Sequence, residues 1–364
     1  MLLDETPAPA TGSAMADEKT PLVLDTWYVA AFSSDLVAGG LLARTLCNQR
    51  VVLYRDATGV PVALHDRCAH RSFPLSRGRI DGNALICGYH GFQYGSDGTC
   101  TKVPSQSSAP RGIGVRAYPV IEQPPLIWIW MGNPSAAADN PVPSPAWMRE
   151  RSGWDLASGY LTLNASYVHM HENLLDLTHI GFLHEKSFGS PEYASAPFET
   201  LIDDTSIVVK RTVQPTFLPP VYANPLNMVD VPAARAVTST FVSPGLSISA
   251  VALRNLSLPE DARIDHRAAT AHLLTPIDAN SIHYHFLIGR DFALGDEATS
   301  TFIANSLRSV FLEDQAALEA ITDVRKDDTE PHADRSVASD KAGIAMRRLL
   351  ARLARAEQLG STGI

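Results

Sequence analysis

Hydrophobic and polar positions alternate over short stretches in the first third of the chain. Turn-forming pairs of residues separate these stretches, for example Asp81-Gly82 and Asp97-Gly98. Short strands at this spacing predict a small all-β domain. The predicted strands are WYVAAF from Trp27, RVVLYRD from Arg50, VPVALHD from Val60, ALICGY from Ala84 and LIWIWMG from Leu126.

The second half of the chain has a different pattern. Residues 133–145 are rich in Ala, Pro, Ser and Asn, which predicts a linker. A strand from Leu161 leads into a helix, and residues 200–295 alternate as strands such as SIVVKRTV, LSISAVAL and SIHYHFLIGR. Helical patterns follow at 299–325 and 336–359. We therefore expect an α+β domain, an antiparallel sheet with helices packed on it, at 146–364. The all-β domain is expected at 21–135, after a disordered terminus at 1–20.

Composition narrows the class of protein. The chain has 364 residues, 45% of them hydrophobic and 19% charged, as in an ordinary globular protein of two domains. Its net charge of −9 argues against nucleic acid or an anionic membrane as a partner, and no apolar run has the length of a membrane span. Asp4 and Glu5 stand where the basic region of a signal peptide would lie, so we expect no signal peptide. We expect a cytoplasmic protein that starts at Met1 or Met15.

Two loops of the all-β domain combine cysteine with histidine. Cys68 and His70 form the first pair, and Cys87 and His90 form the second. Such a set could hold a zinc ion, but the first spacing is tighter than that of most zinc sites. A Rieske [2Fe–2S] centre needs the same residues, with two thiolates on one iron and two imidazoles on the other. The remaining cysteines, Cys47 and Cys100, are expected to be small core residues.

The apolar run Asn173–His184, N-L-L-D-L-T-H-I-G-F-L-H, contains Asp176, His179 and His184. Buried ionisable groups need pairing or a metal, so the run predicts a metal site. Asp176 and His179 share one face of an ideal helix, but His184 does not. We therefore expect the helix to loosen after His179, at Gly181, so that both imidazoles converge.

A carboxylate ligand is expected from the helix at 299–325. Non-haem iron oxygenases use two histidines and one carboxylate and leave the other positions of the iron open. An inward stripe at helical spacing contains one aspartate, Asp314, whereas its neighbour Glu313 lies off the stripe and is expected to be solvated. Asp314 could instead serve in a cap or a salt bridge. The stripe consists of Ile303, Leu307, Val310, Asp314, Ala317 and Ile321.

These segments resemble the Rieske non-haem iron oxygenases, from about Trp27 to the C-terminus. The sequences CAHR at Cys68 and CGYHGFQY at Cys87 resemble the two cluster loops, and the flanking D-R-C-A-H-R-S-F-P-L-S-R-G and D-G-T-C-T-K-V-P-S-Q match as well. The run Asn173–His184 resembles the mononuclear iron motif, and V-F-L-E-D-Q-A-A-L-E-A-I resembles the segment of the third ligand. The chain looks most similar to the vanillate O-demethylase and dicamba monooxygenase group. The resemblance implies a Rieske [2Fe–2S] domain followed by a catalytic mononuclear iron domain of helix-grip type.

The resemblance also implies an activity and partners. Electrons from NAD(P)H would reach the Rieske cluster through a separate reductase, directly or through a ferredoxin, and then the mononuclear Fe(II). O₂ would be activated there, and one oxygen atom inserted into a small aromatic substrate. On a methoxy or N-methyl carbon the product would release formaldehyde. Hydroxylation of an aromatic ring or methyl group is the alternative.

Residue roles follow from the same resemblance. Asp176 would connect His90 of one subunit to His179 of the next, which implies a head-to-tail homotrimer. Asn173 would lie near the iron, and His272 in T-A-H-L-L-T-P would face the substrate, although a core position fits it equally. At two further positions, His169 and His171, the chain departs from the family pattern. They could line the pocket, but we expect both to face solvent.

Two other classes of protein stay open at this point. An electron carrier would use the Rieske domain alone, but it would not need an inward Asp314. A non-catalytic binder would bind a ligand without consuming O₂, although all three ligand positions for iron are filled. Iron content distinguishes the first class from an oxygenase, and O₂ uptake distinguishes the second.

Overall fold

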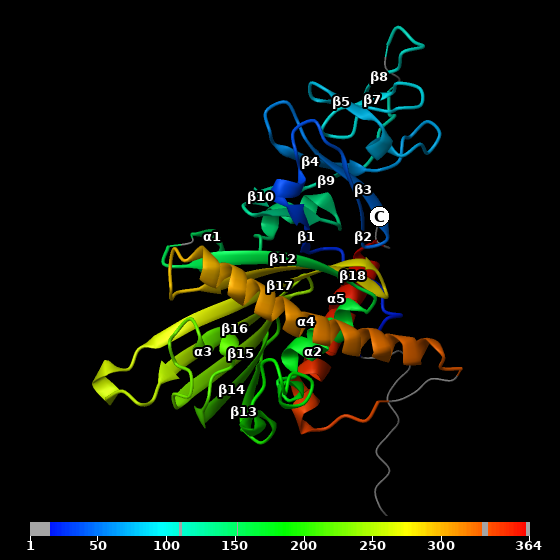
Figure 1. The fold of residues 1–364 in the computed structure, drawn as a ribbon. Helices are drawn as coiled ribbons and strands as arrows, with labels where there is room; N and C mark the ends of the chain where they lie inside the picture. The colour runs from blue at the N-terminus through cyan, green and yellow to red at the C-terminus, as the bar shows by residue number, and fades with distance from the viewer. Residues whose placement is uncertain (1–14, 109–110, 151, 330–333, 362–364) are drawn as a thin grey trace, which may run out of the picture.

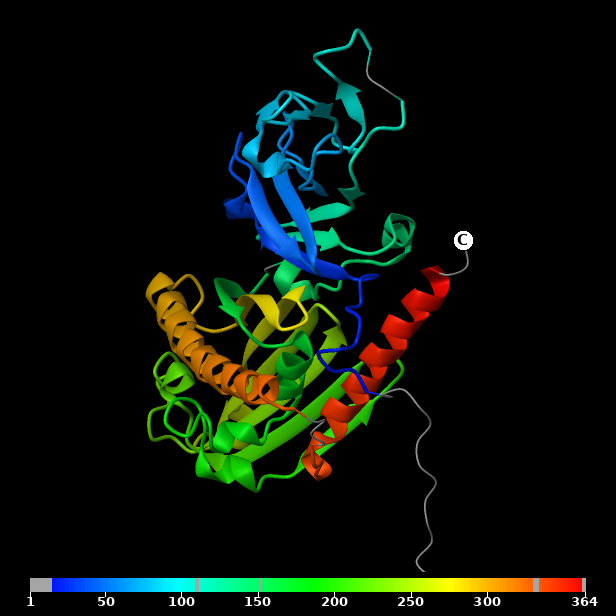
Figure 2. The ribbon, with the colours of Figure 1, turned by 90° about the vertical axis from the view of Figure 1, so that its right-hand side faces the viewer.

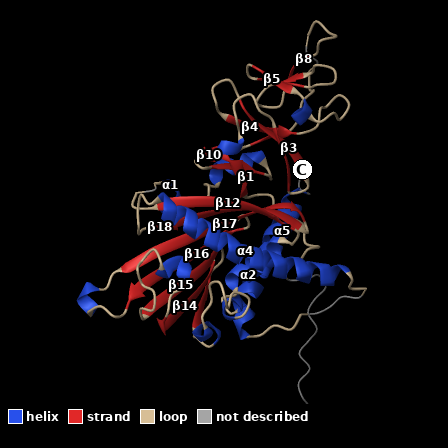
Figure 3. Cartoon of the chain, viewed as in Figure 1, coloured by secondary structure: helices blue, strands red, loops and turns tan. Residues whose placement is uncertain are grey.

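The computed structural model describes residues 15–108, 111–150, 152–329 and 334–361. The molecule has two stacked parts, small sheets in the first third and one large sheet with helices in the remainder (Figure 1). Figure 3 shows that the long helices gather beside the large sheet, whereas the other part is mostly strands and loops. The predicted α+β class is confirmed.

Three small antiparallel sheets form the N-terminal part, with the orders β1-β11-β10, β2-β3-β4-β9 and β5-β6-β7-β8. All five strands predicted from the sequence are present. The β5–β8 sheet lies at the far end of the molecule from the large sheet (Figures 1 and 2). The strands are β1 (Trp27–Phe32), β2 (Leu42–Leu46), β3 (Gln49–Arg55), β4 (Pro61–His65), β5 (Arg79–Asp81), β6 (Ala84–Ile86), β7 (Gln93–Tyr94), β8 (Cys100–Lys102), β9 (Ala117–Tyr118), β10 (Val120–Gln123) and β11 (Leu126–Trp130).

The large sheet is antiparallel throughout, with the order β12-β18-β17-β16-β15-β14-β13. Strand β17, the third in this order, is buried on both faces over residues 268–276, as expected for a strand that is covered on both sides. Ala271 and Leu273 pack with Trp128 of the N-terminal part, and the alternate residues Thr270 and His272 face the helices. The strands are β12 (Asp155–Leu163), β13 (Phe198–Ile202), β14 (Ile207–Thr216), β15 (Ala233–Ser243), β16 (Leu246–Asn255), β17 (Asp265–Asp278) and β18 (Ser281–Arg290).

Helices α2 to α5 lie on the second face of this sheet, whereas the short α1 packs on the first face, with Met148 in the cluster of Ala271 and Leu273. Figure 2 shows α4 and α5 as two separate rods on that side, and α5 packs against α2 and the β13–β14 end of the sheet. The basic residues Arg348 and Arg352 of α5 are exposed. None of the helices in the described ranges is long and apolar enough to cross a membrane. The helices are α1 (Ala146–Arg149), α2 (Tyr167–Leu175), α3 (Pro220–Ala223), α4 (Glu297–Lys326) and α5 (Lys341–Ser361).

The inward stripe of α4 agrees with the prediction as far as Asp314. Beyond it the prediction is wrong for Ile321, whose side chain is exposed, because Leu318 and Thr322 take the buried positions. Spacings of four residues then continue from Asp314, as expected when a helix of 3.6 residues per turn follows a curved surface. Asp314 itself is buried.

The N-terminal segment corrects the expectation of disorder at 1–20. Residues 1–14 lie outside the described residues. Ala16 is fully buried, and its N–H donates to the carbonyl of Arg347 at 2.9 Å. The side chain of Arg347 in turn donates to the carbonyl of Ala16 at 2.6 Å. The segment after Met15 is therefore fixed against α5 by contacts that a local pattern cannot reveal.

Backbone hydrogen bonds join the two parts of the molecule. The N–H groups of Cys47 and Asn48 donate to the carbonyls of Pro276 and Ile277, at 2.6 and 2.8 Å. Both donors lie in the β2–β3 turn with positive φ, at 48° and 63°. The hydroxyl of Thr275 donates to the Val29 carbonyl at 2.8 Å. This seam fixes the N-terminal part on the end of β17.

Candidate active site

The helix that leads to the first histidine ends earlier than the sequence pattern predicts. We expected α2 to run through His179 and loosen at Gly181, but it stops at Leu175, with Asp176 as its C-cap in an extended conformation. One oxygen of Asp176 accepts the N–H and the hydroxyl of Thr178, at 2.8 and 2.6 Å. An aspartate that bonds to the chain two residues ahead competes with the helix, which explains the early stop.

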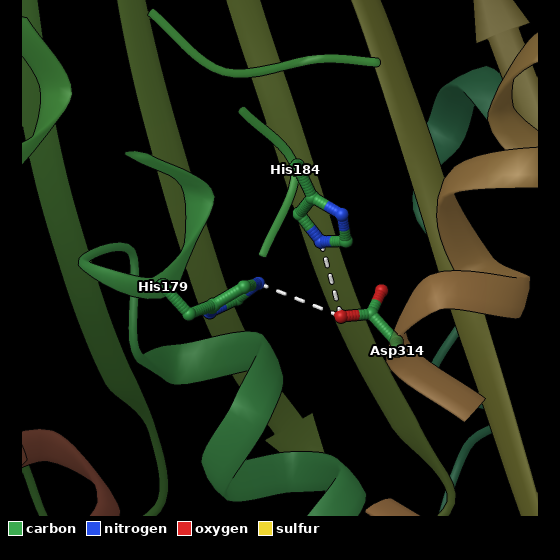
Figure 4. A group of neighbouring side chains, drawn as sticks. All are labelled: His179, His184 and Asp314. Carbon is green, nitrogen blue, oxygen red and sulfur yellow. Dashed lines mark hydrogen bonds and ion pairs between the residues drawn. The ribbon is translucent and has the colours of Figure 1, made fainter. Parts of the chain in front are cut away.

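His179, His184 and Asp314 converge on one point (Figure 4). The Nε2 atoms of His179 and His184 lie 3.5 and 3.1 Å from Oδ1 of Asp314. All three ligand atoms lie within 4.8 Å of one another. Two bonds of about 2.1 Å at a right angle to a first-row metal put their donor atoms about 3 Å apart. The three side chains could therefore hold a metal ion without rearrangement.

The outer nitrogens of both rings have acceptors of their own. Nδ1 of His179 donates to the carbonyl of Asp176 at 2.5 Å, and Nδ1 of His184 donates to Glu313 Oε2 at 2.6 Å. In the neutral rings, Nε2 then carries a lone pair aimed at a carboxylate, an arrangement that repels unless a cation or a proton lies between. This donor set fits a divalent metal ion of the kind bound by two histidines and one carboxylate.

The two rings differ in their electrostatics. Burial lowers the pKa of His179, and Asp314 only partly opposes this effect. Burial also lowers the pKa of His184, but the carboxylates of Asp314 and Glu313 outweigh it and raise the pKa above the ordinary value. The neighbouring carboxylates thus stabilise a positive charge on His184 more than on His179.

Glu313 corrects the prediction that it is solvated. Its Oε2 accepts both Nδ1 of His184 and the hydroxyl of Ser187, at 2.6 and 2.8 Å, and the side chain is only partly exposed. A helix stripe describes which face is inward, but not how far a flexible side chain at the edge of that face reaches. A glutamate next to the ligand candidate, on a helix that must face a histidine loop, was the available signal.

Asn173 lies beside the three side chains. Its Nδ2 donates to Asp314 Oδ1 at 3.0 Å. Its Oδ1 is buried, and within the described part of the chain it has no hydrogen-bond partner. An unpaired buried acceptor at the wall of a cavity suits a water or a substrate hydroxyl.

These residues line one side of a cavity between the helices and strands β15–β17. Its empty volume is about 680 Å³ including the mouth, within the range of small-molecule sites. Most of the remaining wall is apolar, with Leu174, Leu307, Val310 and Phe311 among the lining side chains. The cavity suits an aromatic or similarly apolar ligand.

His272 also lines this cavity. Its Nδ1 and Nε2 lie 2.6 Å from the Tyr284 hydroxyl and 3.1 Å from the Ser249 hydroxyl. Burial lowers its pKa to about 3, so the ring is neutral. A substrate contact of His272 stays a prediction, and such a contact would have to replace one of these hydroxyl partners.

The expectation that His169 and His171 face solvent is wrong, because both are buried. His171 is fully enclosed, with Nδ1 2.9 Å from the Ser247 hydroxyl and Nε2 3.0 Å from the Pro244 carbonyl. Nε2 therefore donates, and Nδ1 accepts from Ser247. These partners come from the β15–β16 turn and the start of β16, which cannot be located from the sequence around α2.

The two cysteine–histidine loops share one hydrogen-bond pattern. In each, the cysteine N–H donates to the carbonyl of a phenylalanine five residues later, and the cysteine carbonyl accepts the N–H of the residue four positions later. That fourth residue has positive φ in both loops, 57° and 74°. The bonds are Cys68 N to Phe73 O (2.9 Å), Ser72 N to Cys68 O (3.0 Å), Cys87 N to Phe92 O (2.8 Å) and Gly91 N to Cys87 O (3.1 Å).

The loops present their four side chains as two pairs. Cys68 and Cys87 are buried, whereas His70 and His90 are exposed, with ring centroids 4.6 Å apart. The Tyr94 hydroxyl accepts the N–H of Ala69 and lies 3.1 Å from the Cys68 sulfur, and towards a thiolate at that position it would be the donor. Buried thiolates opposite exposed imidazoles fit a [2Fe–2S] cluster with one iron at the surface. Cys47 and Cys100 are buried core residues, as predicted.

Comparisons with known proteins agree with this geometry. Residues 26–119 match the Rieske [2Fe-2S] domain, and residues 163–356 match the vanillate O-demethylase oxygenase C-terminal domain. The iron-sulfur subunit of the toluene-4-sulfonate monooxygenase system of Comamonas testosteroni is 33% identical over 82% of this chain and 87% of its own. The vanillate O-demethylase oxygenase subunit of a Pseudomonas strain is 29% identical over 92% and 95%. A crystal structure of dicamba monooxygenase bound to 3,6-dichlorosalicylic acid superposes with a TM-score of 0.83, at 26% identity over 94% and 99% of the chains.

Fold, site and comparisons define the class. The chain belongs to the Rieske non-haem iron oxygenases with a vanillate O-demethylase-type catalytic domain. It is the oxygenase component of a monooxygenase, and its two cofactors are a Rieske [2Fe–2S] cluster and a mononuclear iron. Both matched ranges fall inside the domains that the sequence predicts at 21–135 and 146–364.

Proposed function

We propose that this oxygenase component removes an O- or N-linked methyl group from a small aromatic substrate. The observation that carries the proposal is that His179, His184 and Asp314 form one wall of an otherwise apolar cavity. Relatives named vanillate O-demethylase and dicamba O-demethylase support this reaction class. The balanced reaction of a methoxy arene is ArOCH₃ + O₂ + 2e⁻ + 2H⁺ → ArOH + HCHO + H₂O.

The residues of the chain have distinct roles in this reaction. His179, His184 and Asp314 hold the iron, which when bound activates O₂ with electrons delivered through the Rieske cluster. Glu313 fixes the ring of His184, and Asn173 offers its carbonyl oxygen to a ligand in the cavity. The apolar wall excludes water and orients the ring of the substrate. The cluster is held by Cys68, His70, Cys87 and His90.

Electron delivery needs a partner protein and a second subunit. We propose an NAD(P)H-dependent reductase, acting directly or through a ferredoxin, and a head-to-tail homotrimer. In one chain the cluster-bearing end lies far from α2 and α4 (Figures 1 and 2), which favours transfer between subunits. The proposed contact joins Asp176 to His90 of the next copy. A cytoplasmic location stays a prediction.

The surface around both ends of this proposed contact supports it. Phe182, three residues after His179, is 75% exposed, and Tyr89, next to His90, is 59% exposed. Oδ2 of Asp176 accepts no hydrogen bond from the described residues, so it can accept one from an imidazole. Exposed apolar side chains beside an unused carboxylate oxygen are typical of a surface that another subunit covers.

The test is a screen of methoxy- and N-methyl-arenes with a surrogate reductase. Formaldehyde and substrate-dependent O₂ uptake in equal amounts are the expected result. Asp314→Asn serves as the control, because it keeps the cluster spectrum but loses the mononuclear iron and all O₂ uptake. If O₂ is consumed but none of the substrates in the screen yields formaldehyde, the demethylation proposal is contradicted.

Hydroxylation of a methyl group or an aromatic ring is the second candidate. The relative named toluene-4-sulfonate monooxygenase, 33% identical, favours it. The same screen with methyl-arenes distinguishes the two, because hydroxylation gives an alcohol or a phenol that retains every carbon of the substrate.

A further inference from the structure

Arg235 on β15 is a buried cation that lacks an acidic partner. Its side chain is 1% exposed, and Nη1 donates to the carbonyl of Phe188 at 2.9 Å. Nε and Nη2 have no hydrogen-bond partner, and no carboxylate in the described ranges lies within ion-pair distance. Burying an unpaired charge is costly, and so is leaving two of its donors unused.

The other two arginines buried to the same degree in the described chain have more hydrogen-bond or ion-pair partners. Arg290 lies 3.0 Å from a carboxylate oxygen of Asp155. Arg211 donates to the carbonyls of Leu177 and Tyr193, at 3.3 and 2.5 Å. Burial lowers the pKa of Arg211, and the nearby Asp176 carboxylate partly opposes this effect. Among the described residues Arg211 leaves only its Nε unpaired, whereas Arg235 leaves two nitrogens unpaired and lines the cavity, so Arg235 needs an explanation.

An aromatic cage holds the guanidinium of Arg235 in place. Its central carbon lies 4.1, 4.9 and 5.8 Å from the ring centroids of Phe188, Tyr193 and Tyr222. Cation–π contacts stabilise the charge through the faces of the guanidinium. They use none of its N–H groups, which point along its edges, and those on Nε and Nη2 stay without acceptors among the described residues. The cage thus orients a planar donor whose edge is available.

Arg235 lines the same cavity as the metal-binding side chains, as do Phe188 and Tyr222. The strand register pairs His272 of β17 with Ser247 of β16, and Ser247 with Phe241 of β15. Arg235 lies six residues from Phe241 along β15, and so six residues from the level of His272. This separation is about 20 Å along the strand direction. Arg235 and His272 therefore mark opposite ends of the cavity.

The backbone also connects Arg235 to the metal loop. Phe188, whose carbonyl Arg235 holds, donates its own N–H to the carbonyl of His184 at 2.9 Å. A group bound at Arg235 would thus lie beside the turn that follows a metal ligand. The reacting end of a small substrate could then reach the metal while its other end is fixed.

We propose that Arg235 binds the carboxylate or sulfonate of an acidic aromatic substrate. The guanidinium edge matches two oxygens of either anion in a bidentate contact. The chain carries a net charge of −9, so the protein as a whole repels anions and a local cation must select them. The proposal rests on the proposed function, since it names the substrate class of that same cavity.

The experiment compares each acid with its neutral amide on the holoenzyme. The pairs are 4-methoxybenzoate with 4-methoxybenzamide and 4-methoxybenzenesulfonate with its sulfonamide, which separates the two sources of negative charge. Binding is read by titration calorimetry and turnover by O₂ uptake. The wild type should prefer at least one acid to its amide.

Arg235→Met should weaken binding of the preferred acid about 30-fold or more, with little effect on the amide. Arg235→Lys, which keeps the charge but not the fork, should retain part of the preference and guards against misfolding of the first variant. Arg211→Met is the matched control, a buried arginine outside the cavity, and should leave the ratio of acid to amide unchanged.

Equal losses for acid and amide in Arg235→Met, or a preference that survives it, would overturn the proposal. So would a wild type that prefers the amides. Because binding is measured without turnover, a charge preference that depends on Arg235 but occurs without O₂ uptake would support this proposal and contradict the proposed function.

Discussion

His184 lies between two consecutive residues of α4, with Nδ1 2.6 Å from Glu313 and Nε2 3.1 Å from Asp314. Successive helix residues point about 100° apart. One imidazole can therefore touch both only if it stands across the edge of the helix. The carboxylate on the outer nitrogen fixes the tautomer and makes the inner nitrogen a stronger donor to a metal.

Glu313→Gln should reduce iron affinity or turnover roughly 10- to 100-fold, because the ring loses its charged partner. Iron content after dialysis against a chelator series measures the change. Asp323→Asn, an exposed acid on the same helix, is the control and should retain iron like the wild type. Unchanged affinity in Glu313→Gln would show that Glu313 does not support His184.

Asp176→Asn should keep both cofactors but lower coupled turnover at least 10-fold, since the neutral amide cannot stabilise a charged imidazole of the next subunit. An asparagine oxygen can still accept the two bonds from Thr178, so the local fold is preserved. Iron analysis, cluster spectra and NAD(P)H-coupled product formation are the measurements. Normal coupled activity would rule out the role of Asp176 between subunits.

Tyr94→Phe should lower the reduction potential of the cluster. A hydrogen bond to a cluster sulfur stabilises the more negative, reduced state, and the substitution removes that bond. Protein-film voltammetry measures the shift. Tyr54→Phe is the matched control, because Tyr54 lies in the same core cluster and its buried hydroxyl has no hydrogen-bond partner among the described residues. An equal shift in both variants would point to a general effect of packing.

His171 should make stability fall at acidic pH. Burial lowers its pKa to about 4, whereas an unfolded histidine has a pKa of about 6.5. Between these pH values the unfolded chain binds more protons than the folded protein, so protonation of His171 favours unfolding. This loss of stability is absent above about pH 6.5 and grows as the pH falls towards 4. At pH 5.5 the loss is about 1.4 kcal/mol. The drop in Tm from pH 7.5 to pH 5.5 should be smaller in His171→Gln. Equal drops would contradict the prediction.

The sequence predicts best those features that local spacing determines. Strand alternation and the stripe that turns Asp314 inward are both consequences of a fixed period, so they survive without knowledge of the tertiary structure. The cysteine–histidine loops are similar, because each loop closes on itself within six residues.

The failures are contacts between distant segments. His171 can be buried because Ser247 and Pro244, more than seventy residues away, satisfy both its nitrogens. Glu313 meets His184 across 129 positions of sequence. Arg235 is not among the site residues predicted from the sequence, although its strand contains an indication. It occupies the same face as Ala233, Val237 and Phe241, which alternate as buried residues. A charge in the middle of such an alternation marks a position worth testing.

The cavity is built from two independent sets of elements. The side chains of the proposed metal site come from α4 and the segment after α2, whereas Arg235, Ser249 and Thr270 stand on β15, β16 and β17. Exchanging a strand side chain leaves the backbone ladder of the sheet intact. Natural selection, or a mutant library confined to those strands, can therefore alter which compound is accepted while the oxygen chemistry is inherited unchanged.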